Sequence, residues 1–247
     1  MVVRTLKSII RGGDKMEKRF GIIVATEPEQ APFIEIFGKP TYVHNSDNYT
    51  VLMWNKIHEH TICLIRSGYG EIAAAAATQF LIDKFHVDEV INYGVVGGLR
   101  DDLVFNKVGV VSKIVHYGFD VSGGGKYPVG RYPNQDDVFI RPQNNIFSYW
   151  ATQQALGKDL PDFVCASADK FVMGGPPKRQ LRKEFEADIC EMEAAGIVLT
   201  CKKNNVPCNF IKAISDGVDE DEEAFDRNVH NAAKICVEII FKTIQII

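Results

Sequence analysis

The chain contains 247 residues, with a net charge of −4, an apolar share of 46% and a charged share of 24%. These values are ordinary for a globular protein, and the length suits one substantial α/β domain. The negative charge argues against a broad nucleic-acid surface, and no apolar stretch is long enough to cross a membrane. We therefore expect a protein that binds neither nucleic acid nor membrane.

The cysteines are scattered along the chain, with no CxxC pair, and no secretory signal is evident. This pattern predicts buried thiols in a reducing compartment rather than disulfides or a zinc site. We expect a cytoplasmic protein that uses no metal and no cofactor. The cysteines are Cys63, Cys165, Cys190, Cys201, Cys208 and Cys236.

Residues 1–15 stand apart from the rest of the chain. They are mildly basic, and Gly12 and Gly13 interrupt them before Met16. The segment is compatible with a targeting or membrane-surface role and with a poorly ordered extension. Its apolar run is short and no cleavage-site pattern follows, which favours the extension. We expect a single domain over residues 16–247.

The first half of the domain alternates β-branched runs with a helical pattern. Phe20–Ala25 is a continuous apolar run, which is typical of a strand covered on both faces. We expect a helix over Glu71–Phe85 and a glycine turn over Gly94–Gly98. The other expected strands are Thr50–Trp54 and His60–Ser67, which form a hairpin through residues 55–59, and Glu89–Tyr93.

The second half continues the alternation after a strand expected over Lys107–Val115. Residues 118–133 are rich in glycine and proline and predict a long loop, a feature that is usually functional or mobile. The other expected elements are the strands Phe163–Ser167 and Cys208–Ile214 and the helices Asn144–Leu156, Lys178–Phe185, Met192–Lys203 and Glu223–Ile247.

This alternation predicts a single-domain, three-layer α/β sandwich, in which helices flank a mostly parallel central sheet. Such sheets bind ligands at the carboxyl ends of their strands. Acidic and glycine-rich turns collect at those ends and therefore predict the site. They are Thr26–Gln30, Ser67–Gly70, Gly94–Gly98, Ala168–Gly175, Glu191–Glu193 and Ser215–Asp219.

Two of these turns place glutamates directly after a strand. Glu29 follows the first strand, where a carboxylate is rigidly held yet reachable by solvent, as a general base requires. Glu191 and Glu193 bracket Met192 at a strand-to-helix junction, where a carboxylate can accept two hydrogen bonds from a ribose diol. Acids are also favoured in the first turn of a helix, and this alternative explains Glu191 and Glu193 equally well and is the favoured explanation of Glu29 taken alone.

Two further turns suit recognition of a purine. Asp216 ends a strand before Gly217, and a protonated carboxyl there can neutralise the charge left on a departing base. An aspartate that caps a helix has the same pattern. Phe171 can stack on a planar base while the backbone of Val172 reads its edge, although a lone phenylalanine is more often part of the core.

Taken together and in this order, the motifs resemble the 5′-methylthioadenosine/S-adenosylhomocysteine nucleosidases of the nucleoside phosphorylase superfamily. The resemblance covers nearly the whole chain from Phe20, and the combination of EMEAAGI with AISD is highly specific. The matching motifs are GIIVATEPE (Gly21–Glu29), RSGYGEIAAA (Arg66–Ala75), NYGVVGGL (Asn92–Leu99), SADKF (Ser167–Phe171), CEMEAAGI (Cys190–Ile197) and KAISDGVD (Lys212–Asp219).

The resemblance implies hydrolysis of the N-glycosidic bond of an adenine nucleoside through three catalytic carboxylates. Asp216 would be the general acid that protonates purine N7, and Glu29 would activate the attacking water. Glu193 would bind the ribose hydroxyls, supported by Met192 and Glu191. The transition state would be oxocarbenium-like, so the carboxylates would also stabilise positive charge on the ribose.

The resemblance also implies the substrate-binding residues and a homodimer. Phe171 and the backbone of Val172 would hold the purine, and Phe225, on the loop before the last helix, would cover the 5′ substituent. Phe119 and Pro128 would complete the 5′ pocket of a partner subunit. The other binding residues implied are Ser215, Gly97 and Tyr69. The process implied is methionine salvage, with a small adenine nucleoside as the partner molecule.

The chain departs from the family pattern near the catalytic water and the sugar. Val95 stands where the family usually has a serine, and Lys212 stands where it usually has an arginine. The first change removes a hydroxyl, and the second replaces a fork of donors with a point charge. Thr26 and Tyr69 replace residues that are usually aliphatic or methionine, so the 5′ preference stays open.

Three other functions are compatible with the sequence. A phosphorylase would need cationic and hydroxyl donors for phosphate, but this chain has Asn92 and Val95 at those places. A non-catalytic nucleoside-binding or storage protein would not need Glu29, Glu193 and Asp216 together. A hydrolase of aminodeoxyfutalosine would share the chemistry, and the sequence does not separate it from a methylthioadenosine nucleosidase.

Overall fold

The computed structural model of the chain describes residues 17–220 and 222–247. The extension expected over residues 1–15 lies outside these residues. Within them, one mixed sheet runs between helices. Its strands are β1 Arg19–Val24, β2 Tyr42–Asn45, β3 Thr50–Ile57, β4 His60–Arg66, β5 Glu89–Gly98, β6 Val108–His116, β7 Phe139–Ile140, β8 Asp162–Ser167, β9 Ile189–Glu191 and β10 Cys208–Asp216.

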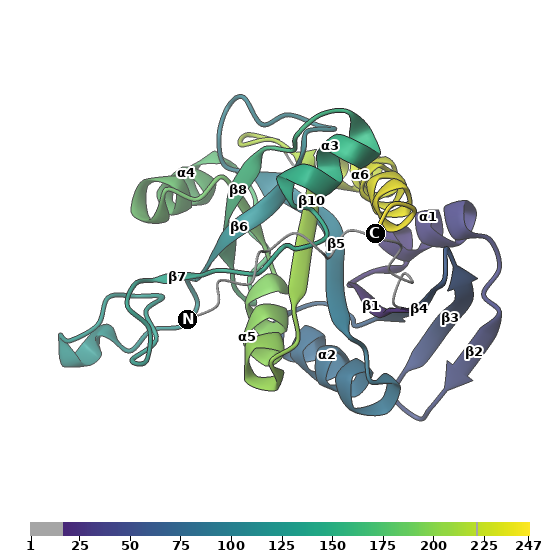
Figure 1. Ribbon diagram of the computed structural model, residues 1–247. Helices are drawn as coiled ribbons and strands as arrows, with labels where there is room; N and C mark the ends of the chain where they lie inside the picture. Colours follow the sequence, from purple (N-terminus) through teal and green to yellow (C-terminus); the bar gives the residue numbers. More distant parts are fainter. Residues whose placement is uncertain (1–16, 221) are drawn as a thin grey trace, which may run out of the picture.

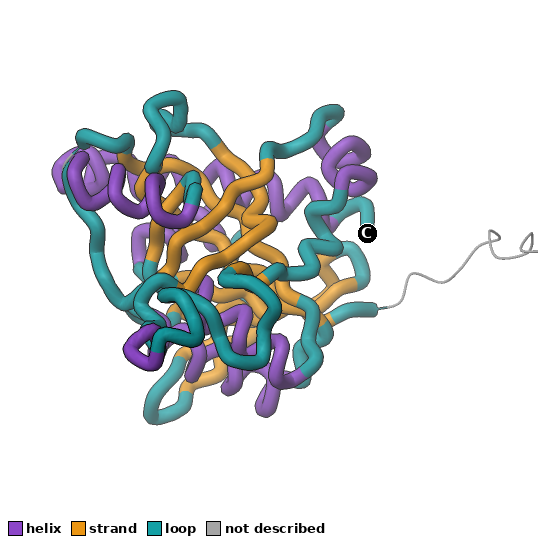
Figure 2. Tube along the Cα trace, turned by 90° about the vertical axis from the view of Figure 1, so that its left-hand side faces the viewer, coloured by secondary structure: helices purple, strands orange, loops and turns teal. Residues whose placement is uncertain are grey.

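The helices form two layers around the sheet (Figure 1). Helices α2 and α5 pack on each other and against one face, while α1 and α3 pack on α6 over the other. Figure 2 shows the strands between these two groups. This arrangement confirms the predicted three-layer α/β sandwich. The helices are α1 Glu27–Phe37, α2 Glu71–Phe85, α3 Tyr149–Leu156, α4 Gly175–Phe185, α5 Ala194–Asn204 and α6 Glu222–Ile244, and Ser122–Gly124 forms a short 3₁₀ turn, η1.

The sheet is more mixed than the sequence predicts, because five of its ten strand pairings among the described residues are antiparallel. Part of it closes on itself. Strand β5 pairs with both β10 and β9, and the order β10-β6-β8-β9 completes a ring of five strands. The ring brings the carboxyl ends of β5, β8, β9 and β10 close together, beside the end of β1.

The apolar run at the start of the domain explains the central position of β1. Phe20, Ile22 and Val24 pack into the core under α1 and α6, while Ile23 faces the core under α2 and α5. All four side chains are completely buried. A strand that is covered on both faces needs apolar residues at successive positions, and the expected strand is therefore confirmed to within one residue.

The glycine turn expected over Gly94–Gly98 is wrong, because these residues continue β5. Residues 94–97 pair with β10, with Gly94 opposite Lys212 and, after a shift of register beyond Ile214, Gly97 opposite Asp216. A glycine in a strand often marks a place where other atoms come close to the backbone, and these two glycines do so inside the site.

Other differences concern the ends of elements. Helix α3 begins at Tyr149 rather than Asn144, because the Asn144 side chain bonds the backbone of Val111 and Phe210 instead. Helix α5 begins at Ala194 rather than Met192, and β10 extends two residues beyond Ile214 to Asp216. The sequence analysis did not predict α1, β2 or β7. Helix α1 contains Pro28 and Pro32, residues that usually mark turns.

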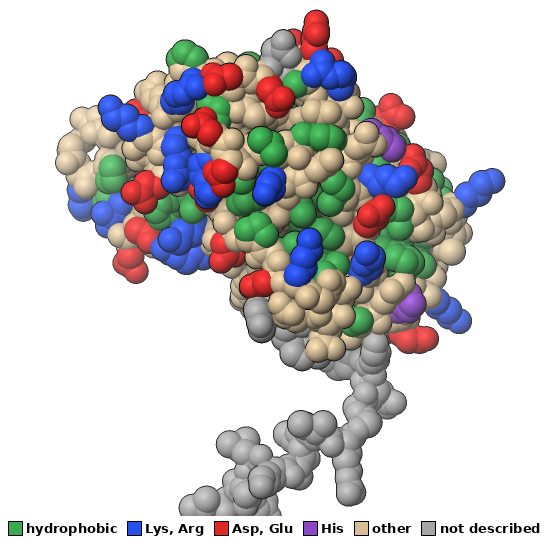
Figure 3. All heavy atoms as spheres, turned by 90° about the horizontal axis from the view of Figure 1, so that it is seen from above, with side chains coloured by type: hydrophobic (Ala, Val, Ile, Leu, Met, Phe, Trp, Pro, Cys, Tyr) green, Lys and Arg blue, Asp and Glu red, His purple; other side chains and the backbone are tan. Residues whose placement is uncertain are grey.

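The surface and the thiols agree with the composition. All six cysteines are free and buried, as expected. Figure 3 shows one face of the molecule, on which acidic and basic side chains are interspersed around apolar ones. No helix among the described residues is both long and apolar enough to cross a bilayer.

Candidate active site

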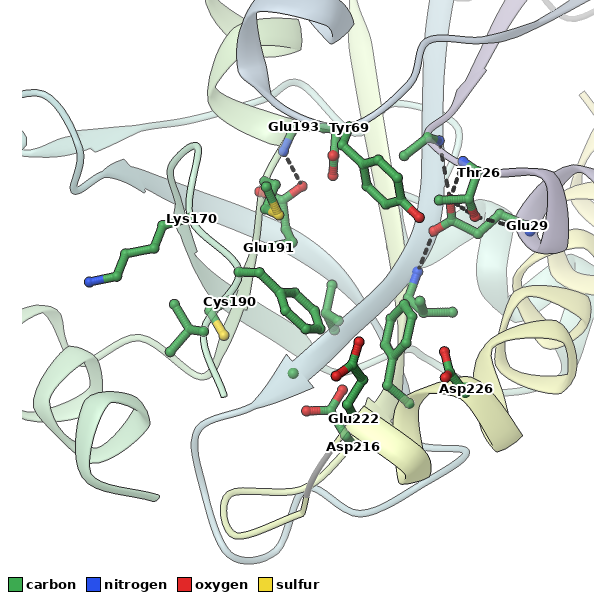
Figure 4. Close-up of a pocket in the computed structure, with 18 residues that line it drawn as sticks. Thr26, Glu29, Tyr69, Lys170, Cys190, Glu191, Glu193, Asp216, Glu222 and Asp226 are labelled. Atoms are coloured by element: carbon green, nitrogen blue, oxygen red, sulfur yellow. Dashed lines mark hydrogen bonds between the residues drawn. The ribbon is translucent and has the colours of Figure 1, made fainter. Parts of the chain in front are cut away.

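One cavity of about 370 Å³ opens at the carboxyl ends of β1, β5, β8, β9 and β10 (Figure 4). Ten of the eleven site residues predicted from the sequence line it, and Ser215 lies behind it. The lining residues are Ala25, Thr26, Glu29, Tyr69, Val95, Val96, Gly97, Lys170, Phe171, Val172, Cys190, Glu191, Met192, Glu193, Asp216, Glu222, Phe225 and Asp226.

Glu29 is held as a hydrogen-bond acceptor at one end of the cavity. Its Oε2 accepts from the backbone N–H of Ala25 at 3.1 Å, and from the N–H and hydroxyl of Thr26, each at 2.9 Å. Its Oε1 accepts from the N–H of Val95 at 3.0 Å. Thr26 and Glu29 form the capping box of α1, so the helix-start interpretation holds, and Glu29 lines the cavity as well.

Gly94 makes room for this carboxylate. A methyl group built on Gly94 would lie 2.5 Å from Glu29 Oε1 and 3.7 Å from Lys212 Nζ. The backbone of β5 therefore approaches Glu29 as closely as it does because residue 94 has no side chain. Val95 contributes its N–H, but it has no hydroxyl with which to hold a water beside Glu29.

Glu191 and Glu193, at the start of α5, have different hydrogen-bond partners. Glu191 accepts from the backbone N–H groups of Glu193 and Ala194 and pairs with the Lys212 ammonium at 3.2 Å, so its oxygens serve the helix and the lysine. The Glu193 carboxylate accepts a hydrogen bond from the Gly70 N–H at 2.9 Å and from no other group among the described residues. Glu193 is therefore the carboxylate of this pair that is available to a ligand.

Burial raises the pKa of Glu193 to about 8, and the neighbouring Glu191 charge acts in the same direction. Lys212 and the Gly70 N–H oppose this shift without cancelling it. Burial by itself lowers the pKa of Lys212, but the Glu191 and Glu193 carboxylates outweigh burial and raise that pKa overall. One buried ammonium thus serves several carboxylates at this end of the cavity.

Asp216 occupies the other end, as the last residue of β10. The helix-cap alternative is wrong for this residue, because the next helix, α6, begins only at Glu222. Asp216 Oδ1 lies 2.7 Å from Ser215 Oγ, and Oδ2 lies 2.5 Å from the Lys178 ammonium. Ser215 Oγ also lies 3.2 Å from the carbonyl of Val96. The carboxyl is 3% exposed, and that exposed part faces the cavity.

Two aromatic rings stand at the mouth of the cavity. Phe171 is 51% exposed and is not a core residue, and its ring meets Phe225 edge to face at a centroid distance of 5.6 Å. Phe225 lies in the first turn of α6, not on the loop before it as expected. Tyr69 extends toward the Glu29 end, whereas the ammonium of Lys170 points away from the carboxylates (Figure 4).

Besides Ala25 and Val96, the sequence analysis missed four residues of the site. Cys190, Glu222 and Asp226 line the cavity, and Lys178 lies directly behind Asp216. Burial raises the pKa of the Cys190 thiol to about 12, so the thiol is not a nucleophile. The burial of Lys178 can be recognised from its position in the sequence of α4. This lysine lies on the inward-facing stripe of α4 with the buried Leu181 and the half-buried Phe185, where the helical period calls for an apolar residue.

Among the described residues, no group of three or more histidine, cysteine, aspartate or glutamate side chains could hold a metal ion. The two histidines that the sequence left unassigned make local contacts. His116 bonds Glu71 at 2.7 Å and Tyr132 at 2.7 Å, and His230 bonds the exposed Glu35 at 2.9 Å. Neither histidine lines the cavity.

Comparisons with known proteins agree with this geometry. A profile of the phosphorylase superfamily matches residues 19–242. A 5′-methylthioadenosine/S-adenosylhomocysteine nucleosidase of Shewanella denitrificans is 30% identical over 230 residues, which cover 90% of this chain and 98% of that protein. An aminodeoxyfutalosine nucleosidase of Campylobacter jejuni is 28% identical over 228 residues, covering 91% and 97%.

A solved structure extends the likeness to three dimensions. The 5′-methylthioadenosine/S-adenosylhomocysteine nucleosidase of Helicobacter pylori, crystallised with a substituted pyrrolidin-3-ol, superimposes with a TM-score of 0.85 at 27% identity. The match covers 93% of this chain and 99% of that one. The resemblance seen in the sequence motifs is thereby confirmed. The chain belongs to the phosphorylase superfamily, in the group of the 5′-methylthioadenosine/S-adenosylhomocysteine nucleosidases and their relatives.

Proposed function

We propose that the protein hydrolyses the N-glycosidic bond of an adenine nucleoside such as 5′-methylthioadenosine or S-adenosylhomocysteine. The observation that carries this proposal is the convergence of Glu29, Glu193 and Asp216 on one cavity (Figure 4). Had these side chains pointed into separate regions, no single nucleoside could meet an acid, a ribose ligand and a base together.

The proposed reaction begins with proton transfer to the base. As the bond between the ribose and the purine breaks, its electron pair goes to the purine, and Asp216 gives a proton to N7. The ribose becomes oxocarbenium-like, and the surrounding carboxylates stabilise its positive charge. Water adds to the anomeric carbon and gives its proton to Glu29, while Glu193 holds the ribose hydroxyls. The products are adenine and a 5-substituted ribose.

The charges that line the cavity favour water over phosphate. Six of the described lining residues are carboxylates, and the one cation among them, Lys170, points away from the carboxylates. A phosphate nucleophile would need cationic and hydroxyl donors beside the ribose, and Val95 supplies neither. Phosphate would instead meet the carboxylate of Glu29.

The test is adenine release from a panel of 5′-modified adenosines, in buffer with and without phosphate. We expect equal rates in both buffers and a free reducing sugar, identified by mass spectrometry, as the second product. A sugar 1-phosphate would indicate a phosphorylase. Absence of adenine release from every member of the panel would indicate a nucleoside-binding protein. Aminodeoxyfutalosine belongs in the panel, because aminodeoxyfutalosine nucleosidases match this chain as well as the 5′-methylthioadenosine/S-adenosylhomocysteine nucleosidases do.

The homodimer stays a prediction, as do a cytoplasmic location and a role in methionine salvage. Two exposed apolar side chains at the start of α2 favour an interface near the cavity, since Tyr69 is 70% and Ile72 80% exposed. Phe119, expected to reach a partner's 5′ pocket together with Pro128, stacks on Tyr132 at a centroid distance of 4.0 Å. Sedimentation of the purified chain would check the oligomeric state.

A further inference from the structure

Helix α4 buries a lysine behind the cavity. Lys178 is completely inaccessible to solvent, and the side chains that share its stripe on the helix, Leu181 and Phe185, are apolar. An ammonium in such a place costs several kcal/mol unless it is paired and hydrogen-bonded. The position therefore requires specific partners for its charge.

Those partners lie at the end of β10. Lys178 Nζ lies 2.5 Å from Asp216 Oδ2 and 2.6 Å from the carbonyl oxygen of Gly217. One side chain from α4 thus fixes both the carboxylate and the backbone that follows it. The neighbouring basic residues of the same helix, Arg179 and Arg182, bind other carboxylates, those of Asp219 and Asp188.

Strand β5 leaves the space that this pairing needs. Gly97 stands opposite Asp216 in the register of β5 and β10. A methyl group built on Gly97 would lie 3.2 Å from Lys178 Cε and 3.3 Å from Asp216 Oδ2. These contacts are tighter than most side chains tolerate, so the absence of a side chain at residue 97 lets the lysine reach the aspartate.

The two oxygens of Asp216 have different neighbours, and this difference decides where a proton can sit. An ammonium has only donors, so Oδ2 faces a group that cannot accept a proton from it. Oδ1 faces the Ser215 hydroxyl, which can donate to Val96 while it accepts from a protonated Oδ1, or donate to Oδ1 once the proton has left. A proton destined for a ligand is therefore carried on Oδ1.

We propose that Lys178 is a positioning residue for Asp216: it holds Oδ2, confines the transferable proton to Oδ1 and balances the carboxylate charge that appears when this proton passes to the purine. The inference rests on the proposed function, in which Asp216 is the general acid. Asp216 loses one proton in the step, the purine gains it, and Lys178 keeps its own protons throughout. An ammonium beside a carboxyl favours the ionised form and so assists this loss.

The test compares two leaving groups. Adenine departs with a proton, whereas the nitrophenolate of a 4-nitrophenyl riboside with the same 5′ group departs without one. We expect Lys178→Met to lower kcat for adenine release by about 10–100-fold, with KM changed less than about threefold. This loss is smaller than the roughly 10²–10⁴-fold contribution of general acid catalysis, because Asp216 itself remains. Nitrophenolate release should stay within about threefold of the original rate. Lys178→Gln retains an N–H donor without the charge, so its kcat for adenine release should lie between those of the original chain and Lys178→Met.

The control is Lys183→Met, which changes an exposed lysine of the same helix and should leave both activities unaltered. Thermal unfolding followed by circular dichroism establishes whether each variant is folded. If Lys178→Met is unfolded, the same comparison of leaving groups is made with Lys178→Gln. Equal loss of both activities would make Lys178 a structural ion-pair partner only and would overturn the inference. Normal adenine release by Lys178→Met would also overturn it.

Asp216→Asn separates this failure from failure of the proposed function. If Asp216→Asn retains adenine release, Asp216 is not the acid, and the proposed function fails together with the inference. If Asp216→Asn loses adenine release but retains nitrophenolate release, the acid role stands. The result for Lys178→Met then decides the inference on its own.

Discussion

The two ends of the cavity, around Glu29 and around Asp216, contain the same three parts: a carboxylate, a buried lysine and a glycine of β5. Gly94 lies opposite Lys212, and Gly97 lies opposite Asp216. At each end the missing side chain of the glycine gives a carboxylate oxygen its place. The difference between the ends lies in the hydrogen-bond partners of the two carboxylates and in how the lysines are shared.

Glu29 is surrounded by groups that only donate or are already donating. Three backbone N–H groups and the Thr26 hydroxyl point at its oxygens. A backbone N–H cannot accept a proton, so this arrangement suits a carboxylate that starts ionised and takes a proton from water. Asp216 instead has one partner, the Ser215 hydroxyl, that can change from donor to acceptor. We therefore propose that the base lies at the first end and the acid at the second.

Of the substitutions considered, Glu29→Gln should cause the largest loss of activity. An amide cannot take the proton of water, and its NH₂ group would face N–H donors on one side. We expect kcat to fall by about 10³-fold for both adenine and nitrophenolate release, within the range for general base catalysis. Steady-state kinetics with the two leaving groups would measure it.

The matched control is Glu27→Gln, which removes an exposed carboxylate from the same helical turn and should change kcat little. If Glu29→Gln impaired adenine release alone, Glu29 would belong with the acid, and the division between the two ends would be wrong.

Alanine at each of the two glycines should have unequal effects. The new methyl group of Gly94→Ala would lie 2.5 Å from Glu29 Oε1, whereas that of Gly97→Ala would lie 3.2 Å or more from its neighbours. Displacing a catalytic group by about 1 Å can cost about 100-fold, so we expect a loss of that size for Gly94→Ala with both leaving groups. Gly97→Ala should lose about tenfold, in adenine release only.

Gly123→Ala is the control for this pair, since a methyl group there meets nothing within 4 Å. Equal losses at residues 94 and 97, or a loss of nitrophenolate release in Gly97→Ala, would show that the two glycines do not serve separate ends of the cavity.

The sequence predicted the carboxylates of both ends but not their support. Glu29 and Asp216 follow strands that are recognisable from apolar runs, and the carboxyl ends of adjacent strands meet at one edge. Lys178 escaped prediction because a lysine on a basic helix is normally solvated, and only its helical phase marks it as buried. Its role depends on a contact with Asp216, 38 residues away in the sequence, that no local pattern encodes.

The glycines of β5 show a second limit of sequence interpretation. Glycine weakens a strand and usually marks a turn, so local propensity favours a turn over Gly94–Gly98. Pairing of this segment with β10 and β9 outweighs that propensity. The closure of the strands into a ring was not predicted for the same reason, because pairing partners are chosen by the packing of the whole sheet.

The lysines differ in the number of carboxylates that each one serves. Lys178 pairs with Asp216, whereas the charge of Lys212 is shared by Glu191, Glu193 and Glu29. A single ammonium cannot balance three buried carboxylates, so one of them keeps its proton. Glu193 is that residue, since burial and Glu191 raise its pKa to about 8. In the unfolded chain the same group would ionise near its ordinary value of 4.5.

Glu193→Gln is expected to change the stability of the fold, and this is the smallest of the effects predicted here. Because the folded chain holds this proton up to about pH 8 and the unfolded chain releases it near pH 4.5, the free energy of unfolding falls as the pH rises between these values. In Glu193→Gln this pH-dependent fall is absent. Urea unfolding at pH 5 and pH 8.5 should therefore show that the free energy of unfolding of the variant, relative to that of the original chain, is higher by roughly 2–4 kcal/mol at pH 8.5 than at pH 5. Glu238→Gln, an exposed site on α6, should show no such gain. If Glu193→Gln kept the original pH dependence, the proton would reside on another carboxylate, and Lys212 would not be shared as inferred here.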